Sequence, residues 1–179
     1  MYYKKIEGER IYLSPMCIED APKYVKWMND FKVTDGINSS AKVITLENEI
    51  KWLEENCKTG NYNFAIVKKE NDELIGNCSF HDIDKIYGTA TVGIFIGEEE
   101  NRNKGYGREA LNLLISYGFD YLNLYNIMLN VYSFNKNAIN CYKKVGFKEF
   151  GRRRNAIMQK NKRYDIIYMD IIREEFYKE

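Results

Sequence analysis

Several features that mark whole classes of protein are missing from this sequence. Its four cysteines, Cys17, Cys57, Cys78 and Cys141, lie far apart, and none belongs to a CxxC pair. This spacing argues against both a zinc site and a disulfide framework. We therefore expect reduced thiols, no bound metal and a cytoplasmic location.

Long apolar segments are also missing. No apolar run approaches the ~20 residues that cross a bilayer, and the N-terminal MYYKKIEGERIYLSP carries charge but lacks the apolar core of an export signal. We expect neither export nor membrane insertion.

An excess of charge of one sign is missing as well. The 27 basic and 26 acidic residues nearly cancel. A balanced chain has no global field that attracts nucleic acid or an anionic membrane, so neither is expected as a partner. Partner choice must depend on local groups.

The sequence contains no repeat and no low-complexity linker. With 179 residues, 45% of them hydrophobic, it is long enough for one well-buried core. We therefore predict a single domain over residues 1–179.

Hydrophobic periodicity predicts alternating groups of strands and helices. The first helix carries Ala21, Tyr24, Val25 and Met28 at helical intervals, and Thr45 is a candidate N-cap for the second. Gly146 is a candidate C-cap for the last helix. Strands are expected at residues 10–16, 62–69, 73–83, 89–97, 126–133 and 165–172, and helices at 18–30, 45–57, 105–122 and 137–146.

The segment EEENRNKGYGREAL, residues 98–111, places two glycines at the start of a predicted helix. Gly105, Gly107 and Ala110 also spell GxGxxA, which a dinucleotide-binding fingerprint allows. That hypothesis lacks its context, because seven polar residues follow the strand and no acid stands about 20 positions later. No Lys-Ser or Lys-Thr follows the glycines, so a nucleoside-triphosphate loop fails too.

The spacing Arg102-x-x-Gly105-x-Gly107 resembles the pyrophosphate loop of the GNAT superfamily of N-acetyltransferases. Glycines let backbone N–H groups approach phosphate, and a helix N-terminus adds positive potential. A glycine-eased turn with solvated charges is the alternative. The resemblance assigns the cofactor loop to Arg102, Asn103, Lys104, Gly105, Tyr106, Gly107 and Arg108.

A second segment, NVYSFNKNAINCYKKVGF, resembles the GNAT motif that follows this loop. Asn135, Tyr142, Gly146 and Phe147 fall on its characteristic positions. The first helices and the C-terminal hairpin look like those of the ribosomal-protein and polyamine (spermidine) acetyltransferase branch, so the resemblance covers nearly the whole chain. It implies an α/β (α+β) fold, a mixed, mainly antiparallel twisted sheet flanked by helices in the order βααβββαβαββ.

The resemblance also implies the chemistry. The pantetheine arm of acetyl-CoA would lie between residues 93–97 and 130–133, contacting the backbone of Phe95 and Ile96. Asn135 would bond the cofactor or an ordered water, and Asn137 would also bind the cofactor. Tyr142 would donate a proton to the departing CoA thiolate, although a tyrosine on a short helix can also be a core residue.

The general base is not assigned by the resemblance. Many relatives carry Glu where this chain has Thr91, and a threonine is not a base near neutral pH. Ordered water, His81, or the carboxylates of Asp82 and Asp84 are the remaining candidates.

The acceptor is expected to be a primary amine of a small molecule, such as a polyamine, an amino sugar or an amino acid, or a protein N-terminus. Acidic residues near the site would favour a polyamine, and a basic run would favour an acidic acceptor. The alternative function is a non-catalytic acyl-CoA-binding domain, which Thr91 favours. Exposed edge strands would allow a homodimer. The acidic candidates are Asp30, Asp35, Glu98, Glu99 and Glu100, and the basic run is Arg152, Arg153 and Arg154.

Overall fold

A computed structural model of the protein describes residues 1–37, 39–59 and 62–178. The chain forms two compact units. The first comprises Met1–Ser79 and Ile94–Leu114, and the second comprises Phe80–Gly93 and the chain from Ile115 onward. Strands β4 (Leu74–Asp84) and β5 (Thr89–Ile96) and helix α4 (Tyr106–Tyr121) contribute residues to both units.

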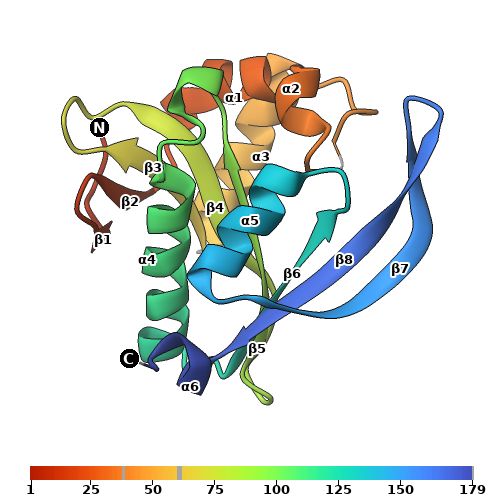
Figure 1. Ribbon diagram of the computed structural model, residues 1–179. Coiled ribbons are helices and arrows are strands. Elements are labelled where there is room, and N and C mark those ends of the chain that lie inside the picture. The colour runs from red at the N-terminus through yellow and green to blue at the C-terminus, as the bar shows by residue number, and fades with distance from the viewer. Residues whose placement is uncertain (38, 60–61, 179) are drawn as a thin grey trace. The chain divides into compact units, whose positions relative to one another are not determined.

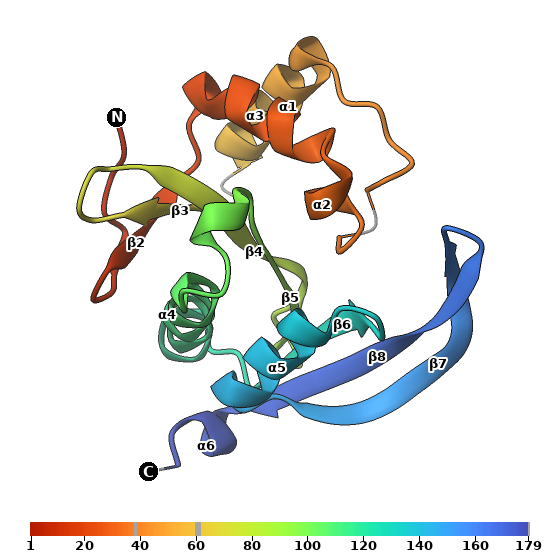
Figure 2. The same ribbon diagram turned by 45° about the horizontal axis from the view of Figure 1, so that its top comes forward.

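The first unit contains a sheet in the order β1-β2-β3-β4-β5 and three helices that lie side by side (Figures 1 and 2). The pairs β1–β2, β2–β3 and β3–β4 are antiparallel. Its remaining elements are β1 (Ile6–Glu7), β2 (Ile11–Pro15), η1 (Ile18–Asp20), α1 (Ala21–Met28), α2 (Phe31–Thr34), α3 (Leu46–Thr59), β3 (Asn63–Lys68) and η2 (Glu99–Asn101).

The second unit continues from β4 and β5 in the order β6-β8-β7. Strand β5 pairs with β6 in parallel, whereas β6–β8 and β7–β8 are antiparallel. Helix α5 lies along β6 and β8, and β7 and β8 form a long curved hairpin (Figures 1 and 2). The new elements are β6 (Asn126–Tyr132), α5 (Lys136–Val145), β7 (Lys148–Gln159), β8 (Lys162–Ile172) and α6 (Arg173–Phe176).

The predicted order of strands and helices is confirmed, with short additions. The additions are β1, α2, α6 and two 3-10 turns. Thr45 caps α3 as predicted, because its Oγ1 accepts from the Asn48 N–H at 3.2 Å. Gly146 ends α5 in the left-handed conformation, at φ 115°. Among the described residues, no helix combines the length and apolar character needed to cross a bilayer.

Helix α1 buries two of the residues that its periodicity predicted, Ala21 and Tyr24, and also Trp27, which was not predicted. Ala21, Tyr24 and Trp27 are buried, while Val25 is only partly buried. The Trp27 ring makes edge contacts with Tyr24, at a centroid distance of 5.5 Å, and with Phe95 of β5, at 5.8 Å. This aromatic group anchors α1 against the end of β5, where the glycine-rich loop begins.

Gly97 follows β5 and lies directly against this indole. A Cβ added at Gly97 would overlap the ring of Trp27, which is only 1% exposed. We expect Gly97→Ala to lower the free energy of unfolding by about 1–3 kcal/mol, the usual cost of overpacking. Urea denaturation measures it. Gly151→Ala is the matched control, because a Cβ at Gly151 would meet no described atom within 4 Å.

Candidate functional site

The loop between β5 and α4 contains two residues in the left-handed region. Asn103 and Gly105 both have positive φ, 59° and 87°. Residues of alternating handedness direct successive N–H groups into one concavity, which is a common anion-binding arrangement. Sequence analysis identified these residues, and the structure places them at the start of α4.

The first turn of α4 adds further donors. The first N–H groups of a helix have no partner within the helix, and the helix dipole makes them attractive to anions. These groups belong to Tyr106, Gly107 and Arg108. Among the described residues, the Glu109 N–H is the first of this helix to donate to the backbone, to the Gly105 carbonyl at 3.0 Å.

Gly107 has no role in packing that would demand a glycine. Of the described atoms, only Ile96 Cγ1 would lie within 4 Å of an added Cβ, at 3.8 Å, an ordinary contact. The absence of a side chain therefore leaves room above the helix start. The donors and this space fit a pyrophosphate, with the exposed Lys104 and Arg108 nearby in sequence to balance its charge.

Arg102 is held by the protein backbone. Its guanidinium donates to the carbonyls of Ile96 at 3.1 Å, Gly97 at 2.7 Å and Lys32 at 3.0 Å. These bonds fasten the end of β5 to α2. The predicted phosphate role of Arg102 stays a prediction, and the observed contacts assign its guanidinium to fixing the loop.

Arg10 was missed by sequence analysis. Its guanidinium donates to the Lys104 carbonyl at 2.9 Å and to Glu109 Oε2 at 3.0 Å, and it lies 4.8 Å from the Tyr106 ring centroid. Arg10 lies 94 residues before Lys104. No short motif connects positions so far apart, so the contact is visible only in the folded chain.

The predicted pantetheine contacts of β5 are partly used within the protein. The Ile96 carbonyl accepts from Arg102, and the Phe95 carbonyl lies against Gly76 of β4. These two backbone acceptors are therefore less available to a cofactor than the sequence suggested.

In the second unit, Asn135 caps α5. Its Oδ1 accepts from the Ala138 N–H at 3.2 Å, so its amide NH₂ is the group that remains for a ligand. Asn137 lies exposed in the first turn of the same helix. The cofactor roles of both residues stay predictions.

Tyr142 lies on α5, with its ring at 6.0 Å from that of Phe147 in an edge contact. Burial raises the pKa of Tyr142 well above its ordinary value. The phenol therefore keeps its proton throughout the neutral range, as a proton donor must.

Pairing between β5 and β6 lies at the beginning of both strands. Thr89, Ala90 and Thr91 face Asn126, Ile127 and Met128, and the rest of β6 pairs with β8 on its other side. Thr91 lies between the buried Ala90 and Val92, so it points to the opposite face of the sheet.

His81 lies on β4 next to Phe80, whose ring is close to Gly118 of α4. Successive strand residues alternate, so His81 points away from α4. Partial burial lowers the pKa of His81, and the nearby Asp82 carboxylate opposes this shift. The imidazole is therefore mainly neutral near pH 7 and able to accept a proton.

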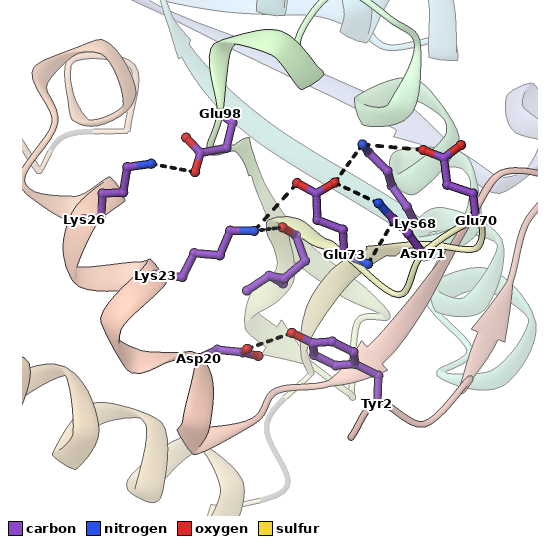
Figure 3. A network of polar contacts seen from close by, with 10 residues as sticks. Tyr2, Asp20, Lys23, Lys26, Lys68, Glu70, Asn71, Glu73 and Glu98 are labelled. Carbon is purple, nitrogen blue, oxygen red and sulfur yellow. Dashed lines mark hydrogen bonds and ion pairs between the residues drawn. The ribbon is translucent and has the colours of Figure 1, made fainter.

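The acidic candidates for acceptor binding are mostly engaged by the protein. Glu98 pairs with Lys26 at 2.9 Å (Figure 3), and Glu99 pairs with Lys32 at 2.8 Å. The Lys32 ammonium lowers the pKa of Glu99. Asp30 caps α2 by accepting from the Lys32 N–H at 2.8 Å. Much of the negative charge that favoured a polyamine is thus balanced locally.

Among the described residues, Arg152 is the member of the basic run that forms ion pairs. Arg152 pairs with Glu149 at 3.0 Å and with Asp165 at 3.3 Å. Arg153 and Arg154 follow on the exposed part of β7.

Comparison with known proteins gives concordant results. A family model described as an acetyltransferase (GNAT) domain matches residues 10–148. An uncharacterized N-acetyltransferase, p20, of Bacillus licheniformis is 31% identical over 171 residues, which are 94% of this chain and 96% of that protein.

Solved structures share the fold. Spermidine N-acetyltransferase from Vibrio cholerae, solved with CoA and spermine, has a TM-score of 0.86 at 20% identity, covering 96% of this chain and 100% of that one. The microcin C7 self-immunity acetyltransferase MccE, solved with acetyl-CoA and AMP, has a TM-score of 0.76 at 21% identity, covering 92% and 93%.

Proposed function

This chain belongs to the GNAT acetyltransferase family, and from that premise we propose that it uses acetyl-CoA to acetylate a primary amine. The observation that carries the proposal is the loop at residues 103–108, where two residues of positive φ lead into the N-terminal N–H groups of α4, beside a glycine that packing does not require. The acceptor amine belongs to a small molecule or a protein N-terminus.

Acetyl-CoA supplies an acetyl group already activated as a thioester, which the amine attacks directly. The chain's own tasks are to position both reactants, to stabilise the developing oxyanion and to move two protons. The loop amides with Lys104 and Arg108 would hold the pyrophosphate. The Asn135 amide would orient the cofactor, and Tyr142 would donate the proton to the departing sulfur.

His81 is the proposed base, and its role predicts a pH profile. Only the neutral imidazole accepts a proton, so kcat should rise with pH through the lowered pKa of His81 and level off near neutrality. His81→Gln should remove this inflection and lower kcat at least about tenfold.

Asp82→Asn distinguishes whether His81 or the neighbouring Asp82 is the base. Because the Asp82 charge raises the pKa of His81, its removal should move the inflection to lower pH while activity persists. Loss of activity in Asp82→Asn, with an unchanged profile in His81→Gln, would assign the base to Asp82 instead.

A thiol-release assay tests the function. The protein is mixed with acetyl-CoA and, separately, spermidine, an aminoglycoside, amino acids, an amino-sugar nucleotide and ribosomal N-terminal peptides. Release of CoA that depends on one amine class supports the proposal and identifies the acceptor. If calorimetry shows CoA binding but none of these amines causes CoA release, the non-catalytic acyl-CoA-binding function is favoured.

Assembly and location complete the proposal. A homodimer is supported by the position of β7 at the edge of its sheet, where no described strand pairs with its outer side. Light scattering measures the mass of the assembly in solution and so tests for the homodimer. A single domain acting in the cytoplasm is supported by the four cysteines, which form no disulfide within the part of the chain that the structure describes.

A further inference from the structure

We propose that Arg10 is a positioning residue for the cofactor loop, acting through Glu109 and the Lys104 carbonyl. The inference rests on the proposed function, because it concerns how the loop becomes able to accept phosphate. Arg10 precedes the loop by more than 90 residues and belongs to neither of the motifs that identify the site.

The problem that Arg10 solves is the charge of Glu109. Glu109 belongs to the first turn of α4, whose N–H groups are offered to phosphate. A carboxylate there is favourable to an isolated helix, but it repels an incoming anion. A loop that binds pyrophosphate therefore needs Glu109 both turned away and neutralised.

Glu109 is engaged at both oxygens by the start of β2. Its Oε1 accepts from the N–H groups of Arg10 at 2.7 Å and Ile11 at 3.2 Å, and its Oε2 accepts from Arg10 Nε at 3.0 Å. The Glu109 side chain is only 16% exposed. Gly8 makes room for it, because an added Cβ there would lie 2.6 Å from Oε1.

The same guanidinium fixes the turn that precedes the helix. It bonds the Lys104 carbonyl at 2.9 Å, and its Nη2 would lie 3.1 Å from a Cβ on Gly105. It also lies over the Tyr106 ring at 4.8 Å. One side chain thus contacts or adjoins three consecutive residues of the loop, so its loss should loosen the amides that bind phosphate.

Arg173 provides a matched control. Its guanidinium also bonds a backbone carbonyl, that of Phe119, approaches the Asp120 carboxylate at 3.5 Å and lies 5.8 Å from the Tyr177 ring. The two arginine side chains are 45% and 42% exposed. Arg173→Ala therefore removes the same kinds of contact, and the partners named here all belong to the second unit.

The experiment is calorimetric titration of CoA into the full chain, with Arg10→Ala, Arg10→Lys, Glu109→Gln, Arg10→Ala/Glu109→Gln and Arg173→Ala. We expect Arg10→Ala to weaken CoA binding about tenfold, which corresponds to a loss of about 1.4 kcal/mol in binding free energy. Arg10→Lys should lie between it and the wild type. In the double variant Arg10→Ala/Glu109→Gln, at least half of this loss in affinity should be recovered on a logarithmic scale, because the second substitution removes the unneutralised charge of Glu109. Arg173→Ala should bind CoA as the wild type does.

Kinetics distinguish positioning from a general loss of structure. Arg10→Ala should raise the KM for acetyl-CoA while the KM for the amine and kcat at saturation stay within about threefold. If Arg10→Ala binds CoA with wild-type affinity, the inference about Arg10 is overturned and the proposed function is unaffected. Failure of Glu109→Gln to restore binding in the Arg10→Ala background would overturn it too, and would make Arg10 a direct phosphate ligand. If the wild type itself does not bind CoA, the proposed function fails first.

Discussion

Replacing Tyr142 with phenylalanine is expected to lower kcat about 100-fold while leaving the affinity for acetyl-CoA nearly unchanged. The change removes one oxygen from a ring that keeps its edge contact with Phe147 at 6.0 Å. Burial raises the pKa of this phenol, so the proton that the thiolate needs is present across the neutral range. Steady-state kinetics and CoA calorimetry measure the two quantities.

Tyr12→Phe is the control for the loss of a buried phenol. Tyr12 is 1% exposed, and its hydroxyl donates to Asp72 at 2.7 Å. Its variant should lose about 1 kcal/mol of stability and keep kcat. If Tyr142→Phe retains the full rate, the departing sulfur takes its proton from another group and Tyr142 is a packing residue.

Replacing Gly107 with aspartate is expected to weaken CoA binding at least about 100-fold, which corresponds to about 2.7 kcal/mol. The substitution places both a side chain and a negative charge where the first turn of α4 would meet phosphate. The free protein should fold normally, since the space at Gly107 is open apart from Ile96.

Gly107→Ala separates steric from electrostatic effects. Its Cβ would make one ordinary contact, 3.8 Å from Ile96 Cγ1, so the fold should tolerate it and CoA affinity should fall by less than about tenfold. Calorimetry on both variants, with their melting temperatures, is the measurement. Equal CoA affinity in the aspartate variant and the wild type would place the phosphate elsewhere.

Local patterns in the sequence were sufficient for most elements of the fold. Strands and long helices were found because their apolar periodicity is strong, and the ends of α3 and α5 were found because Thr45 and Gly146 make local caps. The two-residue β1 and the four-residue α2 and α6 were missed, since segments so short carry no periodic pattern.

The packing of α1 shows where periodicity reaches its limit. The sequence placed Val25 in the buried stripe, but Trp27 is the residue that is 1% exposed. A tryptophan gains much from burial, and Gly97 supplies a flat surface for its ring. That surface lies 70 positions further along the chain, beyond any helical window.

By itself, the sequence determined the acetyltransferase family, the order of the elements and the loop with its glycines, because these depend on contiguous residues and on backbone freedom at Gly105 and Gly107. Only the tertiary structure decided how charges are used. It committed Arg102 to three carbonyls and paired Glu98 and Glu99 with lysines. It also brought Arg10 onto Glu109. The reason is physical: an ion pair depends on distance in space, and a side chain's partners are set by which elements pack together, not by its neighbours in the chain.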